Sequence, residues 1–289
     1  MSKDLTRHLE NLNLDKVELR PLSKSEFSDF KELVATYKFA DGFKRTYSKL
    51  ITDRNYKLAK SEIPNFGLSL APADLSGDWN TCRYATDGCR KACLGIVSGR
   101  NTFGSSKRAK IWRTKLLADH PQIFIRALAD EIRYLNYKYV FKGVTQKDGS
   151  IKKAPHILFR FNVVSDLRFE RFAPQLFELE NVKFYDYTKY PTSKRSVSNN
   201  YRLVGSFTER TTDNQLADYV NSFGSSAVVF LNELPKTFKG FKVVDGDLSD
   251  DRTLKKEVGV VVGLTAKGSA VNDASGFVQR LNNQERVKI

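Results

Sequence analysis

From residue 63 onward the chain alternates short apolar runs with stretches of helical periodicity, and this alternation constrains the fold more than any other feature. Such alternation is typical of parallel strands joined by crossover helices, in an open sheet or a closed barrel. We therefore predict an α/β fold, with a complete or partial TIM-type parallel barrel as the preferred architecture. The seven runs expected to be strands are 66–70, 156–161, 182–187, 201–207, 227–231, 241–244 and 258–263.

The first 60 residues differ from the rest because they are mixed and charged, with a helical stretch around 24–36 and no catalytic motif. We predict that 1–60 is an N-terminal helical extension packing on a barrel-like α/β domain over 61–289. Within that domain a helix is expected to begin at Pro121. Another is expected after the run 201–207, with Asp213 as its cap and Gly224 at its end.

Polar residues collect where the predicted strands end. No glycine-rich dinucleotide or P-loop motif follows any strand. The carboxyl ends of parallel strands are where a barrel builds its site, so we expect a shared pocket there rather than unrelated loop residues. Its carboxylates would serve as acid or base, and its cations would orient an anionic substrate. The candidates are Arg160, Asn162, Asp166, Asp186, Tyr187, Lys189, Asp245, Asp247 and Lys267.

The only three cysteines, Cys82, Cys89 and Cys93, lie in one loop after the first strand with the spacing C-x6-C-x3-C. Thiolates are soft ligands suited to zinc or iron–sulfur centres. Structural zinc usually takes four protein ligands, but there is no fourth cysteine and no nearby histidine. We interpret His8, His120 and His156 as structural residues.

A [4Fe–4S] cluster accommodates three cysteines, because one iron is then left open for water, a small ligand, a substrate or a fourth side chain. We therefore predict that Cys82, Cys89 and Cys93 bind such a cluster. Zinc and buried inert thiols are the alternatives, in that order.

The charge balance leaves the partner open. The chain carries 48 basic and 33 acidic residues, a net charge of +15. Residues 82–153 hold 16 basic against 5 acidic residues, a net charge of +11. This segment could contact nucleic acid or another polyanion, offset the charge of a cluster, or form a solvated face. Residues offering charge or stacking surfaces are Lys107, Arg108, Lys110, Trp112, Arg113, Lys115, Tyr187 and Tyr190.

No stretch approaches the roughly 18 to 20 apolar residues of a membrane span, and the first residues lack the apolar run of a signal peptide. We expect a cytoplasmic protein without a membrane partner. Thiols stay reduced in that compartment, which favours ligands over disulfides.

The segments GLSLAPADLSGDWNTCRYATDGCRKACLG, FRFNVVSDLRFE, KFYDYTK, VVDGDLSDDR and VVGLTAKGSA carry a family resemblance. Over residues 63–275 the chain resembles a bacteriophage family named after gene product 88 of a mycobacteriophage. The resemblance implies a phage-encoded protein of the host cytoplasm with a barrel-like fold. The cysteine loop is also similar to that of radical S-adenosylmethionine enzymes, but its spacing departs from their C-x3-C-x2-C and no GGE-type element is present. The departure puts S-adenosylmethionine binding in doubt.

Three functions are compatible with these features. The first is an enzyme or binder that depends on a [4Fe–4S] cluster at the mouth of a barrel, of radical S-adenosylmethionine-like ancestry. The second is a non-catalytic nucleic-acid-binding phage protein with a structural cluster or zinc. The third is a structural zinc protein that recruits a host factor. The sequence names no substrate or reaction.

Overall fold

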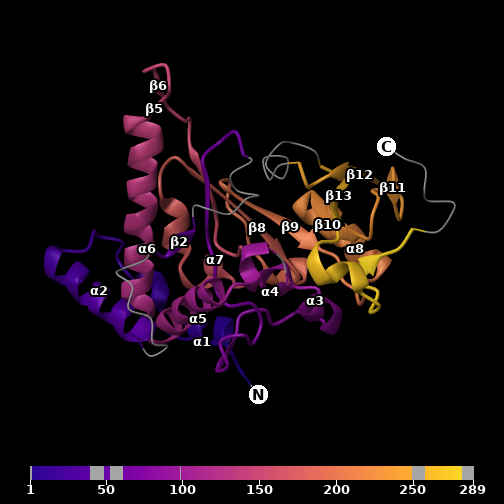
Figure 1. Ribbon diagram of the computed structural model, residues 1–289, viewed down its shortest axis with the longest axis horizontal. Coiled ribbons are helices and arrows are strands. Elements are labelled where there is room, and N and C mark those ends of the chain that lie inside the picture. Colours follow the sequence, from indigo (N-terminus) through magenta and orange to yellow (C-terminus); the bar gives the residue numbers. More distant parts are fainter. Residues whose placement is uncertain (1, 40–48, 53–60, 98, 249–257, 282–289) are drawn as a thin grey trace.

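The computed structural model describes residues 2–39, 49–52, 61–97, 99–248 and 258–281. A ten-stranded mixed sheet runs through this part of the chain, in the order β11-β12-β13-β10-β9-β8-β7-β3-β2, with β14 paired to β10 outside this path. In Figure 1 the strands β8, β9, β10, β13, β12 and β11 follow one another from left to right, which is this order read in reverse. The strands are β2 (Ile51–Thr52), β3 (Asn65–Leu68), β7 (Ile157–Arg160), β8 (Val182–Thr188), β9 (Tyr201–Ser206), β10 (Ser225–Phe230), β11 (Thr237–Phe238), β12 (Phe241–Asp245), β13 (Val260–Thr265) and β14 (Val278–Gln279).

Each of the seven predicted apolar runs overlaps a strand of this sheet. These strands are β3, β7, β8, β9, β10, β12 and β13, and they run parallel to their neighbours in this set. The central strands are almost wholly buried, as β10 and β13 show, paired through Ala227 and Val262. Strands covered on both faces require continuous apolar sequence, which is why these runs were recognisable.

The predicted TIM-type closure is not confirmed, because the sheet is open within the described residues. Its path ends at β2 and β11, each paired antiparallel to its neighbour. β13 also lies between β10 and β12, so the strand order does not follow the sequence around a ring. Periodicity indicates strands and helices, whereas closure depends on strand tilt and stagger, which it does not encode.

Helices α5 and α6 follow the cysteine segment, and α8 connects β9 to β10. Pro121 is at the first turn of α6, as predicted. The cap of α8 is Thr212 rather than the predicted Asp213: its hydroxyl accepts from the backbone N–H of Gln215, and a capping box forms. Gly224 ends α8 in the left-handed conformation, as expected. The helices are α1 (Leu5–Glu10), α2 (Lys24–Phe39), α3 (Asp87–Lys91), α4 (Leu94–Val97), α5 (Gly104–Asp119), α6 (Pro121–Asn136), α7 (Phe169–Phe172) and α8 (Asp213–Phe223).

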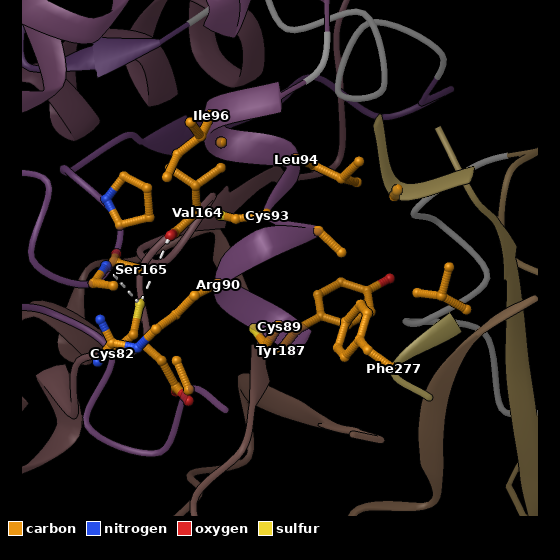
Figure 2. Close-up of a pocket in the computed structure, with 18 of the residues that line it drawn as sticks. Cys82, Cys89, Arg90, Cys93, Leu94, Ile96, Val164, Ser165, Tyr187 and Phe277 are labelled. Atoms are coloured by element: carbon orange, nitrogen blue, oxygen red, sulfur yellow. Dashed lines mark hydrogen bonds between the residues drawn. The ribbon is translucent and has the colours of Figure 1, made fainter. Parts of the chain in front are cut away.

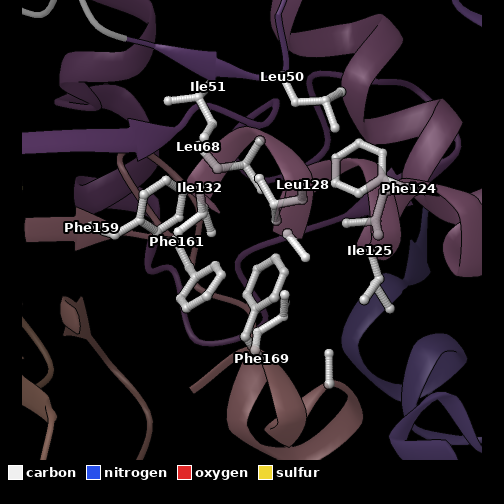
Figure 3. Packing of buried hydrophobic residues seen from close by; sticks show 14 of the residues in the cluster. Leu50, Ile51, Leu68, Phe124, Ile125, Leu128, Ile132, Phe159, Phe161 and Phe169 are labelled. Carbon is white, nitrogen blue, oxygen red and sulfur yellow. The ribbon is translucent and has the colours of Figure 1, made fainter. Parts of the chain in front are cut away.

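The largest core cluster joins the N-terminal helices to the sheet. Figure 3 shows the part of this cluster where Leu128 of α6 packs near Leu68 of β3 and Phe159 of β7. Leu5 of α1 and Phe30 of α2 belong to the same cluster as Leu128 of α6 and Phe159 of β7. The N-terminal region thus contributes to the main core and supplies β2 to the sheet. The predicted boundary at residue 60 lies outside the described residues and stays a prediction.

Two small pairings complete the fold. β1 (Lys3–Asp4) pairs with β4 (Trp79–Asn80), and β5 (Val144–Thr145) forms a hairpin with β6 (Ile151–Lys152). Within the described residues no helix is both long and apolar enough to cross a membrane.

Candidate metal centre

A cavity of about 240 Å³ lies where several parallel strands end, and all three cysteines line it (Figure 2). Arg160 at the end of β7, Tyr187 in β8 and Thr265 at the end of β13 contribute to its wall. Much of the remaining wall is apolar: Pro72, Ala73, Ala92, Leu94, Ile96, Val163, Val164, Leu264, Ala270 and Phe277. The carboxyl edge of a parallel sheet thus faces the cysteine segment across a partly apolar pocket.

Each cysteine is held by a different local structure. Cys82 lies in the loop after β4, where its backbone N–H donates to Asn80 Oδ1 at 2.8 Å and its Sγ accepts from the backbone N–H of Ala73 at 3.3 Å. Cys89 is within α3, and Cys93 lies between α3 and α4. A short loop and two short helices therefore bring the three thiols to one cavity.

Glu209, in the loop after β9, forms hydrogen bonds with the cysteine segment. One carboxylate oxygen accepts from the hydroxyl of Thr86 at 2.7 Å, and the other accepts from the backbone N–H of Gly88 at 2.9 Å. Thr86 also caps α3 by accepting from the backbone N–H of Cys89. Glu209 was not predicted, although it follows a strand end, where the other candidates were sought.

Burial disfavours the thiolate form of Cys82 and Cys93. It raises the pKa of Cys82 to about 12 and raises the pKa of Cys93 above its ordinary value. Lys189 lines the same cavity as the three cysteines. Burial alone would lower its pKa, but the charge of Asp166 and of the thiolate forms of Cys89, Cys82 and Cys93 raises it. A metal would displace the thiol protons on binding.

Six of the nine predicted pocket residues line the cavity: Arg160, Asp166, Tyr187, Lys189, Asp247 and Lys267. The guanidinium of Arg160 stacks on the ring of Tyr187, 4.5 Å from its centroid. Lys267 forms an ion pair with Asp247, which also accepts from the backbone N–H of Thr265 at 2.8 Å. Burial alone would raise the pKa of Asp247, but hydrogen bonds from Lys267 and Thr265 lower it.

The other three, Asn162, Asp186 and Asp245, are not part of the cavity wall. Asp186 is fully buried and accepts from the backbone N–H of Asn162 at 2.7 Å and from the Tyr201 hydroxyl at 3.1 Å. It neighbours Tyr187 in β8, and successive side chains of a strand point to opposite faces. Asp245 accepts from the backbone N–H of Asp247, so it shapes the loop.

A buried ionic network adjoins the cavity at Asp166. Arg195 donates to Asp166 at 3.2 Å, to Glu170 at 2.6 Å and to the Tyr201 hydroxyl at 2.6 Å. Asp166 also accepts from the backbone N–H of Lys189 at 2.8 Å. Arg195 was not predicted, because it lies in a polar loop without an apolar pattern.

The predicted charge-and-stacking residues after the cysteines are accessible only in part, and polyanion binding through them stays a prediction. Lys110, Trp112, Arg113 and Tyr190 are buried, and Lys107 is the exposed member of the set. Lys110 is fully enclosed and donates to the carbonyl of Gly95 and to Asn101 Oδ1. Lysine and arginine can be buried in this way because their aliphatic stems pack against apolar surface. Lys110 thus stabilises the cysteine segment through its hydrogen bond to Gly95.

The arrangement of the donor side chains bears on which kind of metal centre the cavity could hold. Within the described residues, no three His, Cys, Asp or Glu side chains converge closely enough to hold one metal ion. None of the histidines at positions 8, 120 and 156 lines the cavity. In a [4Fe–4S] cluster each thiolate binds a different iron, so its ligands surround the cluster instead of meeting at one point.

Fold and site define an α/β protein with a three-cysteine pocket at the carboxyl edge of a parallel sheet. The family model described as Gene product 88 matches residues 41–281, and the chain belongs to this bacteriophage family. Comparisons with curated proteins and with solved structures found no significant match.

Proposed function

We propose that this protein binds a [4Fe–4S] cluster through Cys82, Cys89 and Cys93 and presents its open iron to an anionic ligand. The observation that carries the proposal is that the three cysteines line one cavity together with charged side chains of both signs: Arg160, Lys189 and Lys267 are its cations, and Asp166 and Asp247 are its carboxylates. The cluster would supply a Lewis-acidic or redox-active iron.

The protein's own residues supply binding and orientation. Lys189 lines the same cavity as all three thiols, so its charge offsets that of thiolate ligands. Arg160, oriented by Tyr187 and by donation to the carbonyl of Asn162 at 3.0 Å, provides a planar cation suited to carboxylate or phosphate. The apolar wall excludes water, which strengthens these charge interactions. An ancestry shared with radical S-adenosylmethionine enzymes is part of the proposal.

Anaerobic reconstitution with iron and sulfide tests the proposal. We expect a brown protein with broad absorbance at roughly 400 nm, where thiolate-to-iron charge transfer falls. Cys82→Ser, Cys89→Ser and Cys93→Ser should each lose most of this absorbance.

Lys91→Ala is the matched control, because Lys91 is exposed in α3 between two of the cysteines and does not line the cavity. It should retain the wild-type spectrum. A colourless protein that holds stoichiometric zinc would remove the proposal.

A further inference from the structure

The far end of α6 carries an exposed surface remote in sequence from the cysteine segment. It consists of a π-helical turn, Tyr137–Lys142, and the β5–β6 hairpin, which stands at the top of α6 in Figure 1. We call it the α6-tip surface and define it by Tyr137, Lys138, Phe141, Lys142, Lys147, Ile151, Lys152 and Lys153, all exposed.

Contacts between the turn and the hairpin hold this surface together. The backbone N–H of Ala154 donates to the carbonyl of Tyr139 at 2.9 Å. Gly143 packs so closely on the hairpin that an added Cβ would lie 2.6 Å from Ile151 Cγ2. Within the hairpin the backbone N–H of Gln146 donates to the carbonyl of Ser150 at 2.8 Å. The lysines of both parts are therefore presented on one body.

Two aromatic rings of this surface share a groove. Tyr137 is 59% exposed and Phe141 is 53% exposed, and both line a groove of about 390 Å³ beside Leu179. Rings four residues apart on a helical turn lie on the same side. Their exposed faces can stack on flat ligands at little entropic cost.

The positive charge of the α6-tip surface favours a polyanion as its ligand. Five lysines, at positions 138, 142, 147, 152 and 153, lie on the turn and the hairpin, while Asp148 is the acidic residue of the hairpin turn. Arg133, Glu178 and Glu180 line the groove together with the rings, so a phosphate backbone would follow the lysines outside the groove with its bases toward the rings. Unpaired bases can stack on exposed rings, whereas paired bases are already stacked within a duplex.

We propose that the α6-tip surface binds single-stranded nucleic acid, with bases stacked on Tyr137 and Phe141 and phosphates contacted by its lysines. Stacking and phosphate contact together are the two elements of sequence-tolerant single-strand binding. An anionic membrane is the other polyanion, and the test includes anionic phospholipid vesicles to distinguish it. This binding is independent of the cluster.

Fluorescence anisotropy with a labelled single-stranded oligonucleotide, as DNA and as RNA, tests the proposal. Tyr137→Ala and Phe141→Ala should each weaken binding by about 5-fold to 100-fold, as expected for one lost stacking contact. These changes leave the net charge unaltered, so they separate stacking from the general attraction of a chain of charge +15. The double change Lys142→Glu and Lys152→Glu should weaken binding and make it less dependent on salt.

Phe27→Ala and Lys236→Glu are matched controls, because both residues are exposed and lie outside the α6-tip surface. Phe27→Ala should bind the oligonucleotide as tightly as the wild type, and Lys236→Glu nearly as tightly. Phe141→Trp should retain the binding that Phe141→Ala loses, and its tryptophan fluorescence should be quenched in the complex. Four results would each overturn the proposal. Two concern the wild-type chain: no binding of the oligonucleotide at low salt, or tighter binding of a duplex. The other two concern the variants: control variants that weaken binding as much as the ring variants do, or ring variants that weaken binding only to anionic phospholipid vesicles. Circular dichroism of every variant establishes that the fold is retained.

Discussion

Gly88 lies where the helix that carries Cys89 meets two other segments, and a side chain has no space there. An added Cβ would lie 2.2 Å from Ser275 Oγ and 2.8 Å from both Glu209 Oε2 and Phe277 Cβ. We therefore expect Gly88→Ala to lower the free energy of unfolding by about 1–3 kcal/mol, as overpacking does. Urea unfolding measures this loss.

Gly104→Ala is the control for Gly88→Ala. Its added Cβ would meet nothing closer than Arg108 Nη1 at 3.4 Å, an ordinary contact. Gly104→Ala should leave the stability unchanged or slightly higher. Equal stability of the two variants would contradict the close packing at Gly88.

Asp186 should make the stability fall as pH rises from about 4 to about 7. Burial raises its pKa to about 7, despite the opposing charges of Arg160 and Arg195. An unfolded aspartate has a pKa of about 3.9. Between these values the folded protein keeps a proton that the unfolded chain releases, so the contribution is full below about pH 4 and is lost by about pH 7.

Urea unfolding of the wild type and of Asp186→Asn at several pH values measures this effect. The wild type should lose up to about 1.4 kcal/mol per pH unit from this group, and the variant should lose that component of the slope whatever its absolute stability. Parallel stability profiles would contradict a protonated Asp186 below neutral pH.

The sequence could predict which side chains line the cavity only from their position relative to the ends of the strands. A polar residue at a strand end was a sound guide to Arg160, Asp166 and Lys267 in the cavity wall. The same rule could not tell Tyr187 from Asp186, because the face that each side chain takes depends on the register of β8. Arg195 binds Asp166 across 29 residues of sequence, a contact that no local pattern encodes.

At the scale of an element, the start of α8 distinguishes two adjacent candidate caps. Thr212 forms the capping box with Gln215, whereas Asp213 is the first helical residue and pairs with Lys239 at the surface. Thr212→Ala should cost about 1 kcal/mol of stability, and Asp213→Ala less than about 0.5 kcal/mol. Thermal unfolding of both variants compares them; a larger loss for Asp213→Ala would contradict the assigned cap.

The strands were predictable because the buried parallel strands have nearly continuous apolar sequence. The edge strands β2 and β11 were not, since each has two residues and no pattern of its own. These antiparallel edges distinguish the open sheet from the predicted closed barrel. Local sequence therefore identified the repeating units, and long-range pairing determined how they assemble.

Across the whole molecule, the basic residues have two different roles that net charge alone does not separate. Lys110 and Arg113 are buried behind the cysteine segment, whereas the lysines of the α6-tip surface are exposed. The sequence predicted a single basic stretch for polyanion binding. Burial separates it into a supporting part and a surface that remains accessible.

The central claim is that three cysteines on one cavity hold a four-iron cluster. The most direct test is the iron and acid-labile sulfide content of the anaerobically reconstituted chain, measured beside the number of reactive thiols. We expect about four irons and about four sulfides per chain, with all three cysteines protected from alkylation until the cluster is removed. One zinc or no metal per chain, with the cysteines freely alkylated, would contradict the claim.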